Sequence, residues 1–391
     1  MENIDFQPRT RLVFGADAID RLGELALELG ATRVLMVSDP GVVAVGHFQR
    51  GVDVLHKSGL HVEAFHGVHE NPSTRDVMNG VEVAKEVQPD LLIGLGGGSA
   101  MDCAKGINFI HSCGGKMEDY WGVGKATSEM LPMIAVPTTA GTGSEAQSFA
   151  LISQEESHVK MACGDIKAAC RIAVLDPKLT LTQPAKVTAL TGIDAVSHAL
   201  ESYVTKRRNT LSACFSRQAW QRLCVGLPRV IETPGDLEAR GEMQLGAFFA
   251  GLAIETSMLG AAHALANPLT ARYGIVHGQA VGMMLPTVIR FNSEEVEGWY
   301  KDLWRDVEES PLGQESRREN ASDSLSRFVH RLVQLCGLKT ELAQVGVEED
   351  SLDQLAEDAT SQWTGTFNPR PLTQADFREL YHQTYQVREV G

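Results

Sequence analysis

The stretch LLIGLGGGSAMDCAK, residues 91–105, decides the fold. Its mostly apolar start predicts a strand, and three glycines at 96–98 end that strand before a helical pattern begins. Glycine lets a backbone approach a ligand closely, and a helix N-terminus offers free N–H groups to a phosphate. The stretch matches neither the G-x-G-x-x-G fingerprint nor the Walker A sequence. It predicts a strand–loop–helix unit for a nucleotide, with an ordinary structural turn as the alternative.

The residues around this unit alternate between short apolar runs and helical patterns. Strands are predicted at residues 11–14, 33–37, 61–65, 91–95, 133–136 and 172–175, and helices between them at 18–29, 41–58 and 74–86. Alternation of this kind is typical of a parallel sheet covered by helices. We therefore expect an α/β, Rossmann-like dinucleotide-binding domain over residues 1–180.

The pattern changes after residue 180, where apolar residues recur at helical spacing and convincing strands are absent. Helices are predicted at residues 184–205, 210–230, 237–265, 277–291, 322–336 and 375–387. The charge-rich residues 293–323, with two Trp and a Tyr, are expected to form a solvated helix and loop. Residues 181–391 are thus predicted to be an all-α domain.

A second polar loop, VPTTAGTGSE at residues 136–145, follows another apolar strand. Its hydroxyl groups and glycines are suited to hydrogen bonds with phosphate, ribose or a nicotinamide ring, and a polar loop with a helix cap is the alternative. Asp39 ends the strand at residues 34–38. A carboxylate there accepts bonds from ribose hydroxyls and repels a 2′-phosphate, although Asp39-Pro40-Gly41 is also turn chemistry. Open α/β sheets bind ligands at the carboxyl ends of their strands.

Four residues in the second half form a candidate metal site. Asp194 and His198 are four residues apart, so on a helix both project from one face. His263 lies in GAAHALANPL and His277 in GIVHGQAVG. Three imidazoles and a carboxylate suit Fe²⁺ or Zn²⁺ with a position left for a substrate oxygen. The alternative is a capping Asp and three histidines hydrogen-bonded in the core.

Composition limits the class of protein. The net charge of -15 argues against nucleic acid or an anionic membrane as the partner. Seven scattered cysteines contain no CxxC pair, so a disulfide framework or a zinc ribbon is not expected. The N-terminus has no signal-peptide pattern and no apolar run reaches the length of a membrane span. We expect a reduced, cytoplasmic protein.

Together these motifs resemble the iron-containing (group III) alcohol dehydrogenases over almost the whole chain. The matching segments are Asn71-Pro72-Ser73, GGGSAMDCAK, PTTAGTGSE, HVKM, AVLDPKLT, TGIDAVSHALESYV, GAAHALANPL, YGIVHG and FNPRPLT. The resemblance implies an NAD-dependent oxidoreductase (EC 1.1.1.-) that transfers hydride between NAD(H) and an alcohol, aldehyde or ketone. It also implies a divalent metal that polarises the substrate oxygen. The family favours homodimers and larger homo-oligomers.

The resemblance also assigns roles by matching position. Asp194, His198, His263 and His277 match the metal ligands, with Fe²⁺ favoured and Zn²⁺ as the alternative. The cofactor-binding positions are Asp39, Asn71, Gly97, Gly98, Ser99, Asp102, Thr138, Thr139, Thr142, Lys160 and Leu179. Phe149, Ile254 and Glu255 match the substrate pocket.

Two departures from the family pattern stand out. Asn267 occupies a position where the family often carries a histidine proposed as a proton relay, and an amide cannot titrate near neutral pH. We expect Asn267 to orient water or a substrate hydroxyl, or else to fill space. Ile254 and Glu255 replace a common Phe and Asn, which favours a bulkier, hydroxylated substrate unless Glu255 is structural. The alternatives are a zinc-dependent glycerol- or sugar-alcohol-type dehydrogenase and a non-catalytic nucleotide- or metal-binding subunit.

Overall fold

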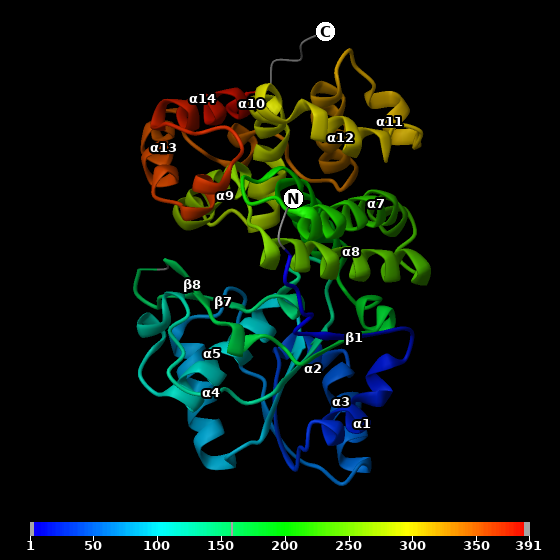
Figure 1. The fold of residues 1–391 in the computed structure, drawn as a ribbon, viewed down its shortest axis with the longest axis vertical. Helices are drawn as coiled ribbons and strands as arrows, with labels where there is room; N and C mark the ends of the chain where they lie inside the picture. The colour runs from blue at the N-terminus through cyan, green and yellow to red at the C-terminus, as the bar shows by residue number, and fades with distance from the viewer. Residues whose placement is uncertain (1–3, 158, 387–391) are drawn as a thin grey trace. The chain divides into compact units, whose positions relative to one another are not determined.

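The structure is a computed structural model that describes residues 4–157 and 159–386. The chain clusters into two compact units (Figure 1). Unit 1 comprises Met1–Thr139 and Ser144–Gln183, and unit 2 comprises Ala140–Gly143 and Pro184–Gly391. The short segment Ala140–Gly143, inside the threonine-rich loop, therefore belongs to the second unit.

Unit 1 contains a six-stranded sheet in which every neighbouring pair is parallel. The strand order is β1-β9-β6-β4-β2-β3. The strands are β1 (Arg11–Phe14), β2 (Arg33–Val37), β3 (His61–Phe65), β4 (Leu91–Gly96), β6 (Met133–Pro137) and β9 (Ile172–Leu175). All six predicted strands are present, and the predicted α/β fold of this part is confirmed.

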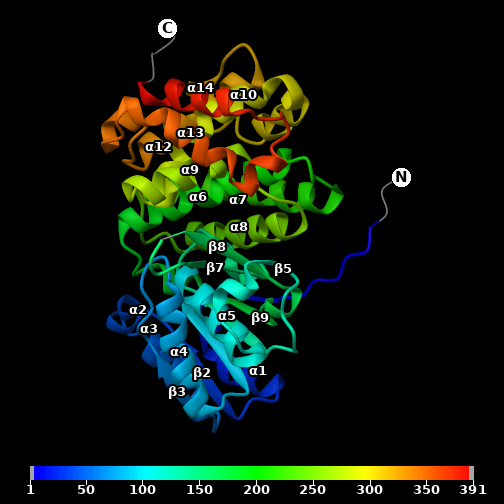
Figure 2. The same ribbon diagram turned by 90° about the vertical axis from the view of Figure 1, so that its left-hand side faces the viewer.

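Alternation along the strands divides the apolar side chains between two cores. On β2, Val34 and Met36 join one core, whereas Leu35 and Val37 join the other. Successive side chains of a strand point to opposite faces, so a strand buried on both faces is apolar throughout. Helices α1 and α3 cover one face, and α4 and α5 cover the other, nearest the viewer in Figure 2.

The helices of unit 1 are η1 (Ala18–Arg21), α1 (Leu22–Glu28), α2 (Pro40–Ala44), α3 (His47–Lys57), α4 (Thr74–Val87), α5 (Gly98–Cys113), η2 (Met117–Tyr120), η3 (Ser144–Ala146), η4 (Ile166–Ala168) and η5 (Pro177–Thr180). The prediction of one helix over residues 41–58 is wrong. Gly46 has φ 84° and separates α2 from α3, because the left-handed region that glycine adopts interrupts a right-handed helix.

A second, three-stranded sheet in unit 1 was not predicted from the sequence. Its order is β5-β8-β7, with β5 (Gly122–Val123), β7 (Phe149–Ser153) and β8 (Lys160–Gly164). β7 and β8 pair antiparallel, and β5 pairs parallel with β8. β5 has only two residues, and in β8 Lys160, Ala162 and Gly164 are of types depleted in strands.

Unit 2 is helical, and no strand occurs in the part of it that the structure describes. Its helices are α6 (Ala185–Val204), α7 (Thr210–Glu232), α8 (Leu237–Thr256), α9 (Ala261–Tyr273), α10 (His277–Arg305), α11 (Pro311–Ser316), α12 (Ala321–Leu335), η6 (Leu342–Val345), η7 (Glu349–Ser351), α13 (Leu352–Thr360), η8 (Trp363–Phe367) and α14 (Gln374–Tyr385). The predicted all-α character is confirmed. The prediction that the last helix ends at Val387 lies outside the described residues.

The predicted single helix over residues 237–265 is wrong, because the chain breaks between α8 and α9. Ser257 ends α8 with φ -139° and ψ -114°, and Gly260 precedes α9. The two helices are bent by 104° relative to each other. Both are buried on most sides, so the apolar pattern runs across the break and conceals it. The break places His263 in the first turn of a new helix.

The expectation of a solvated segment at residues 293–323 is wrong in its first part. Helical structure continues to Arg305 beyond a kink at Val296, whose φ is -131° and ψ 18°. Tyr300, Leu303 and Trp304, after the kink, are buried in the core of unit 2. Positions 300, 303 and 304 lie on one helical face, whereas the charged side chains occupy the other. Charge density therefore concealed an amphipathic helix.

No single helix in the described part of the chain is long and apolar enough to cross a membrane. Only α8 and α9 taken together reach the required length and composition, and they do so across their 104° bend.

Candidate metal and nucleotide sites

Three helices of unit 2 supply the four predicted metal ligands. Asp194 and His198 are one turn apart on α6, and both side chains are buried. His263 is the third residue of α9, and His277 is the first residue of α10. The turns between helices therefore decide whether the last two side chains reach the first two.

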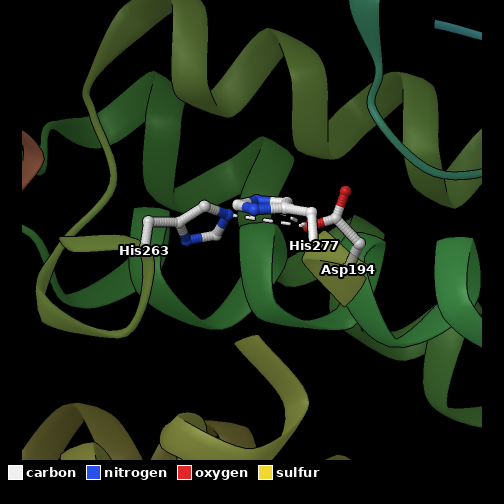
Figure 3. Close-up of side chains that lie close together, drawn as sticks. All are labelled: Asp194, His263 and His277. Atoms are coloured by element: carbon white, nitrogen blue, oxygen red, sulfur yellow. Dashed lines mark ion pairs between the residues drawn. The ribbon is translucent and has the colours of Figure 1, made fainter. Parts of the chain in front are cut away.

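The three histidines converge on one carboxylate oxygen. Oδ1 of Asp194 lies 3.4 Å from Nε2 of His198, 3.6 Å from Nε2 of His263 and 3.7 Å from Nε2 of His277. Figure 3 shows His263 and His277 facing Asp194. The imidazole rings of His198 and His263 stack with centroids 4.9 Å apart. The structure thus brings all four predicted ligands together.

The polar atoms at the centre of this cluster suit a bound cation. Oδ1 of Asp194 and Nε2 of His263 are buried and have no hydrogen-bond partner among the described residues. The separations of 3.4 to 3.7 Å exceed hydrogen-bond length. Ligands about 2.1 Å from a metal stand roughly 3.4 Å apart in a tetrahedron. The ligand atoms of Asp194, His263 and His277 all lie within 4.8 Å of one another, as in a divalent metal site, and His198 adjoins this group through its contact with Asp194.

The charges within the cluster also favour a cation. Burial by itself raises the pKa of the Asp194 carboxyl, but the imidazoles of His198, His277 and His263 outweigh it and hold that pKa below its ordinary value. Burial lowers the pKa of His198. For His263, burial lowers the pKa, but Glu201 and Asp194 together raise it to about 9. An ionised carboxylate thus lies at the centre of three imidazoles.

Glu201 belongs to this site although it was not predicted as a functional residue. Its Oε2 lies 2.5 Å from Nδ1 of His263, and Oε1 accepts a hydrogen bond from the backbone N–H of Ala262 at 2.7 Å. A carboxylate on the far nitrogen of a ligand imidazole fixes the tautomer that leaves Nε2 free for metal. The spacing of Glu201 in the sequence could have revealed its role, because Asp194, His198 and Glu201 lie on one face of α6.

In unit 1, three adjacent strands bring the predicted nucleotide residues together. Strands β2, β4 and β6 are neighbours, and their carboxyl ends carry Asp39, the glycines and the threonines. A Cβ on Gly96 would lie 3.0 Å from Oδ2 of Asp39. The N–H of Thr138 donates to the carbonyl of Gly96 at 2.9 Å. These strand ends lie where the order of the strands along the chain reverses, between β2 and β4, and open α/β sheets bind ligands at such a point.

The N-terminus of α5 supports the phosphate-binding prediction. Gly97 is its N-cap and has no side chain to cap the helix, and Gly98 and Ser99 are its first two residues. The first N–H groups of a helix lack intrahelical partners and suit an anion. A Cβ on Gly97 would lie 3.4 Å from Cγ2 of Thr139, so the glycine and threonine loops approach each other closely.

The remaining predicted cofactor positions are more dispersed. Nζ of Lys160, at the start of β8, donates to Oδ1 of Asn71 at 3.0 Å, so these two predicted residues contact each other. Leu179 is buried in the core of unit 1. Thr142 lies in the segment that clusters with unit 2.

Asp102 lies in a buried polar network. Its Oδ1 accepts from the Ser144 hydroxyl at 2.6 Å, and burial raises its pKa. Nζ of Lys105 donates to the carbonyl oxygens of Ser144, Gln147 and Phe149 at 2.7 to 2.9 Å. Lys105 was not predicted as a site residue, and the available signal was a lysine in a helix whose other residues are mostly small or apolar. It anchors the chain that follows the threonine loop.

The residues assigned to catalysis and the substrate pocket have separate partners. Asn267 donates through Nδ2 to Oε1 of Gln362 at 2.9 Å. Phe149 begins β7, where its ring packs over Gly164. On α8, Ile254 is buried and Glu255 is half-buried.

Comparisons with known proteins agree with this combination of fold and site, which is that of a metal-dependent oxidoreductase. Residues 8–177 match the iron-containing alcohol dehydrogenase model, and residues 188–385 match the C-terminal model of the same family. Alcohol dehydrogenase 4 of Schizosaccharomyces pombe is 32% identical over 94% of this chain and 86% of its own. The NAD-dependent methanol dehydrogenase of Bacillus methanolicus is 32% identical, over 94% of this chain and 96% of its own.

Two solved structures have the same fold. A 1,3-propanediol oxidoreductase superposes with a TM-score of 0.92 at 29% identity, over 98% of this chain and 100% of its own. A sulfoacetaldehyde reductase from Bifidobacterium kashiwanohense, solved with NAD⁺, gives 0.88 at 26% identity, over 99% and 100%. The chain belongs to the iron-containing alcohol dehydrogenase family, and it is an NAD-dependent oxidoreductase of that family.

Proposed function

We propose that this protein transfers hydride between NAD(H) and a small alcohol or aldehyde, mainly in the direction of aldehyde or ketone reduction. In this proposal Asp194, His198, His263 and His277 hold the metal. Three nitrogens and one oxygen suit both Fe²⁺ and Zn²⁺. Fe²⁺ is the expected ion because the chain belongs to the iron-containing family, and Zn²⁺ is the alternative. The observation that carries the proposal is the convergence of three Nε2 atoms on the buried Oδ1 of Asp194.

The protein's own residues position the two reactants. The backbone at Gly97, Gly98 and Ser99 is proposed to bind the pyrophosphate, because it forms an uncapped helix N-terminus. Asp39 is proposed to accept bonds from the adenosine ribose. When bound, the divalent ion would act as a Lewis acid on the substrate oxygen. The nicotinamide gives the hydride in reduction and takes it in oxidation, so the reaction needs no side-chain nucleophile.

For the substrate, we propose a compound that carries further hydroxyl groups. Glu255 places a half-buried carboxylate beside buried Ile254 on α8, and a carboxylate accepts hydrogen bonds from hydroxyls. The family acts on small alcohols and aldehydes. A panel of methanol, butanol, 1,3-propanediol, glycerol and their aldehydes, each supplied with NAD(H) or NADP(H), tests this proposal. Reaction with short linear alcohols alone would contradict it.

The metal assignment requires a separate experiment. Protein purified without oxygen should contain a divalent metal and lose turnover in chelator. His277→Ala should lose both metal and turnover, because it removes a ligand. His277 is chosen because it is the least buried of the four ligands, so its truncation disrupts the fold least. His61→Ala, on exposed β3, is the matched control. Binding of metal and NADH without turnover of any substrate would indicate a binding subunit instead of an enzyme.

We also expect a homodimer or larger homo-oligomer, because the family favours such assemblies. Size-exclusion chromatography with light scattering measures the mass directly. A monomer at all concentrations would contradict this expectation.

A further inference from the structure

The first turn of α9, which carries His263, is capped by side chains from distant parts of the chain. Its N-cap residue is Gly260, which has no side chain to accept from the helix. The N–H groups of a first helical turn have no partner within the helix. Here the N–H of Ala261 donates to Oδ1 of Asn368 at 3.2 Å, and that of Ala262 donates to Oε1 of Glu201 at 2.7 Å. His263 is the next residue.

Gly260 leaves the space that these caps occupy. A Cβ there would lie 3.0 Å from Oε1 of Glu201 and 3.1 Å from Oδ1 of Asn368, which is closer than most Cβ contacts. Its φ of -143° lies outside the left-handed region that favours glycine, and the close Cβ contacts are a reason for glycine at this position. The glycine therefore belongs to the capping arrangement.

Both caps are themselves held in place. Asn368 and Asn292 form a reciprocal amide pair, with Nδ2-to-Oδ1 distances of 2.7 and 3.0 Å. Nδ2 of Asn368 also donates to the carbonyl of Arg370 at 2.7 Å. Glu201, Asn292 and Asn368 are each at most 2% exposed. Buried polar groups that are fully paired are rigid.

This network joins the three helices that carry the candidate ligands. Glu201 lies on α6 with Asp194 and His198, and Asn292 lies on α10, which begins at His277. Asn368 lies in the segment FNPRPLT near the C-terminus. That segment matches the family pattern but has no place in the proposed chemistry.

We propose that Glu201 and Asn368 are positioning residues that cap α9 in trans and thereby fix the location and tautomer of His263 for metal binding. This inference rests on the proposed role of His263 as a ligand. Glu201 contributes two acceptors, one to Ala262 and one to Nδ1 of His263. Asn368 acts on α9 through the helix N-terminus, and its amide also pairs with Asn292 on α10.

The first test variant is Glu201→Gln, which keeps the size of the side chain. Glutamine offers one acceptor where Glu201 uses two, so its NH₂ group faces either Ala262 N–H or Nδ1 of His263. In the second case the imidazole proton moves to Nε2 and blocks the metal position. We expect Co²⁺ affinity, measured by competition with a chelator, to fall 10- to 100-fold. The visible absorption band of bound Co²⁺ should change as well.

The second variant is Asn368→Ala, which removes the acceptor for Ala261 and the amide partner of Asn292 and leaves the Glu201–His263 contact in place. We expect Co²⁺ affinity to fall by roughly tenfold, the lower end of the range for outer-shell residues. Asn320→Ala is the matched control, because Asn320 caps α12 in the ordinary way by accepting from Asp323 N–H at 2.8 Å. It should lose stability to urea without losing Co²⁺ affinity.

The outcomes separate the two proposals. If wild-type protein binds Co²⁺ and both variants match it in affinity and spectrum, the trans-capping role is overturned while the metal site stands. If wild-type protein binds no Co²⁺, the metal site fails, and the positioning role fails with it. Weaker, spectrally altered binding in Glu201→Gln and Asn368→Ala, with Asn320→Ala unchanged, supports the inference.

Discussion

The side-chain ammonium of Lys105 lies 2.7 Å from the carbonyl oxygen of Ser144 and 2.9 Å from its hydroxyl, and no part of Lys105 reaches solvent. The same nitrogen also donates to the carbonyls of Gln147 and Phe149. One buried cation therefore fixes residues 144–149, which comprise the end of the threonine loop proposed to bind the nucleotide and the residues just after it.

Replacing this cation should destabilise unit 1 and weaken nucleotide binding. Lys105→Met leaves buried acceptors without a donor, and we expect a loss of about 3–5 kcal/mol in the free energy of unfolding. Urea denaturation measures the loss, and NADH fluorescence titration should show weaker binding. Lys85→Met, on the exposed face of α4, is the control and should change stability by less than about 0.5 kcal/mol. Equal effects of the two variants would contradict an anchoring role.

The neighbouring Glu145 should make stability depend on pH. Burial raises its pKa from 4.5 to about 7, although Lys105 lowers it in part. The folded protein therefore favours the protonated form. The contribution of protonated Glu145 to the free energy of unfolding is fully present below pH 4.5 and is lost as pH rises through about 7. A shift of this size corresponds to about 3 kcal/mol.

Glu145→Gln imitates the protonated form at every pH. We expect it to be more stable than wild type above pH 8, by up to about 3 kcal/mol, with the difference shrinking toward pH 5. Denaturation from pH 5 to 9 tests this, with Glu86→Gln on the exposed side of α4 as control. A constant difference across that range would show that Glu145 does not titrate there.

The sequence predicted those features that depend on local pattern. The apolar runs at β2 and β4 marked strands because strands buried on both faces are apolar throughout. Where helices were buried on several sides, as at Ser257–Gly260 between α8 and α9, no polar stripe marked the break, and the prediction failed.

Long-range partners were beyond the reach of local pattern. Glu201 and His263 are 62 residues apart, and Asn368 and Ala261 are 107 residues apart. Their contacts depend on how α6, α9 and the C-terminal segment pack, which no spacing within one helix reveals. The ligand set was found because family motifs identified its members, whereas its supporting residues needed the structure.

Asp39 should decide between NAD and NADP. Its Oδ1 caps α2 by accepting from Val42 N–H at 3.0 Å, and Oδ2 faces Gly96. Asn caps a helix as well as Asp does, so Asp39→Asn removes the charge and keeps the cap. We expect kcat/KM for NADPH to rise roughly tenfold, or about 1.4 kcal/mol, with unchanged stability. Asp350→Asn, at an exposed position, is the control. No gain with NADPH would place the specificity elsewhere.

Metal binding should stabilise the folded protein through Asp194. A ligand that binds only the folded state at 100 times its Kd adds about 2.7 kcal/mol. We expect Zn²⁺ to raise the Tm of metal-free wild type and to leave Asp194→Asn unchanged, because the variant lacks the central carboxylate. Differential scanning calorimetry with and without chelator makes the measurement. A metal-dependent Tm in Asp194→Asn equal to that of wild type would exclude this carboxylate as a ligand.

Asn267 offers a test of the proton's route. It donates to Gln362 at 2.9 Å and cannot titrate near neutral pH, so wild-type kcat/KM should show no ionisation from this position. Asn267→His introduces an imidazole, whose ordinary pKa is about 6.5. We expect alcohol oxidation in this variant to rise with pH through that value, because the neutral imidazole accepts the proton. Asn267→Leu, which has no titratable group, is the control. If Asn267→His and wild type share one pH–rate profile, the position has no relay role to restore, and the proton leaves through water, the cofactor ribose or another histidine.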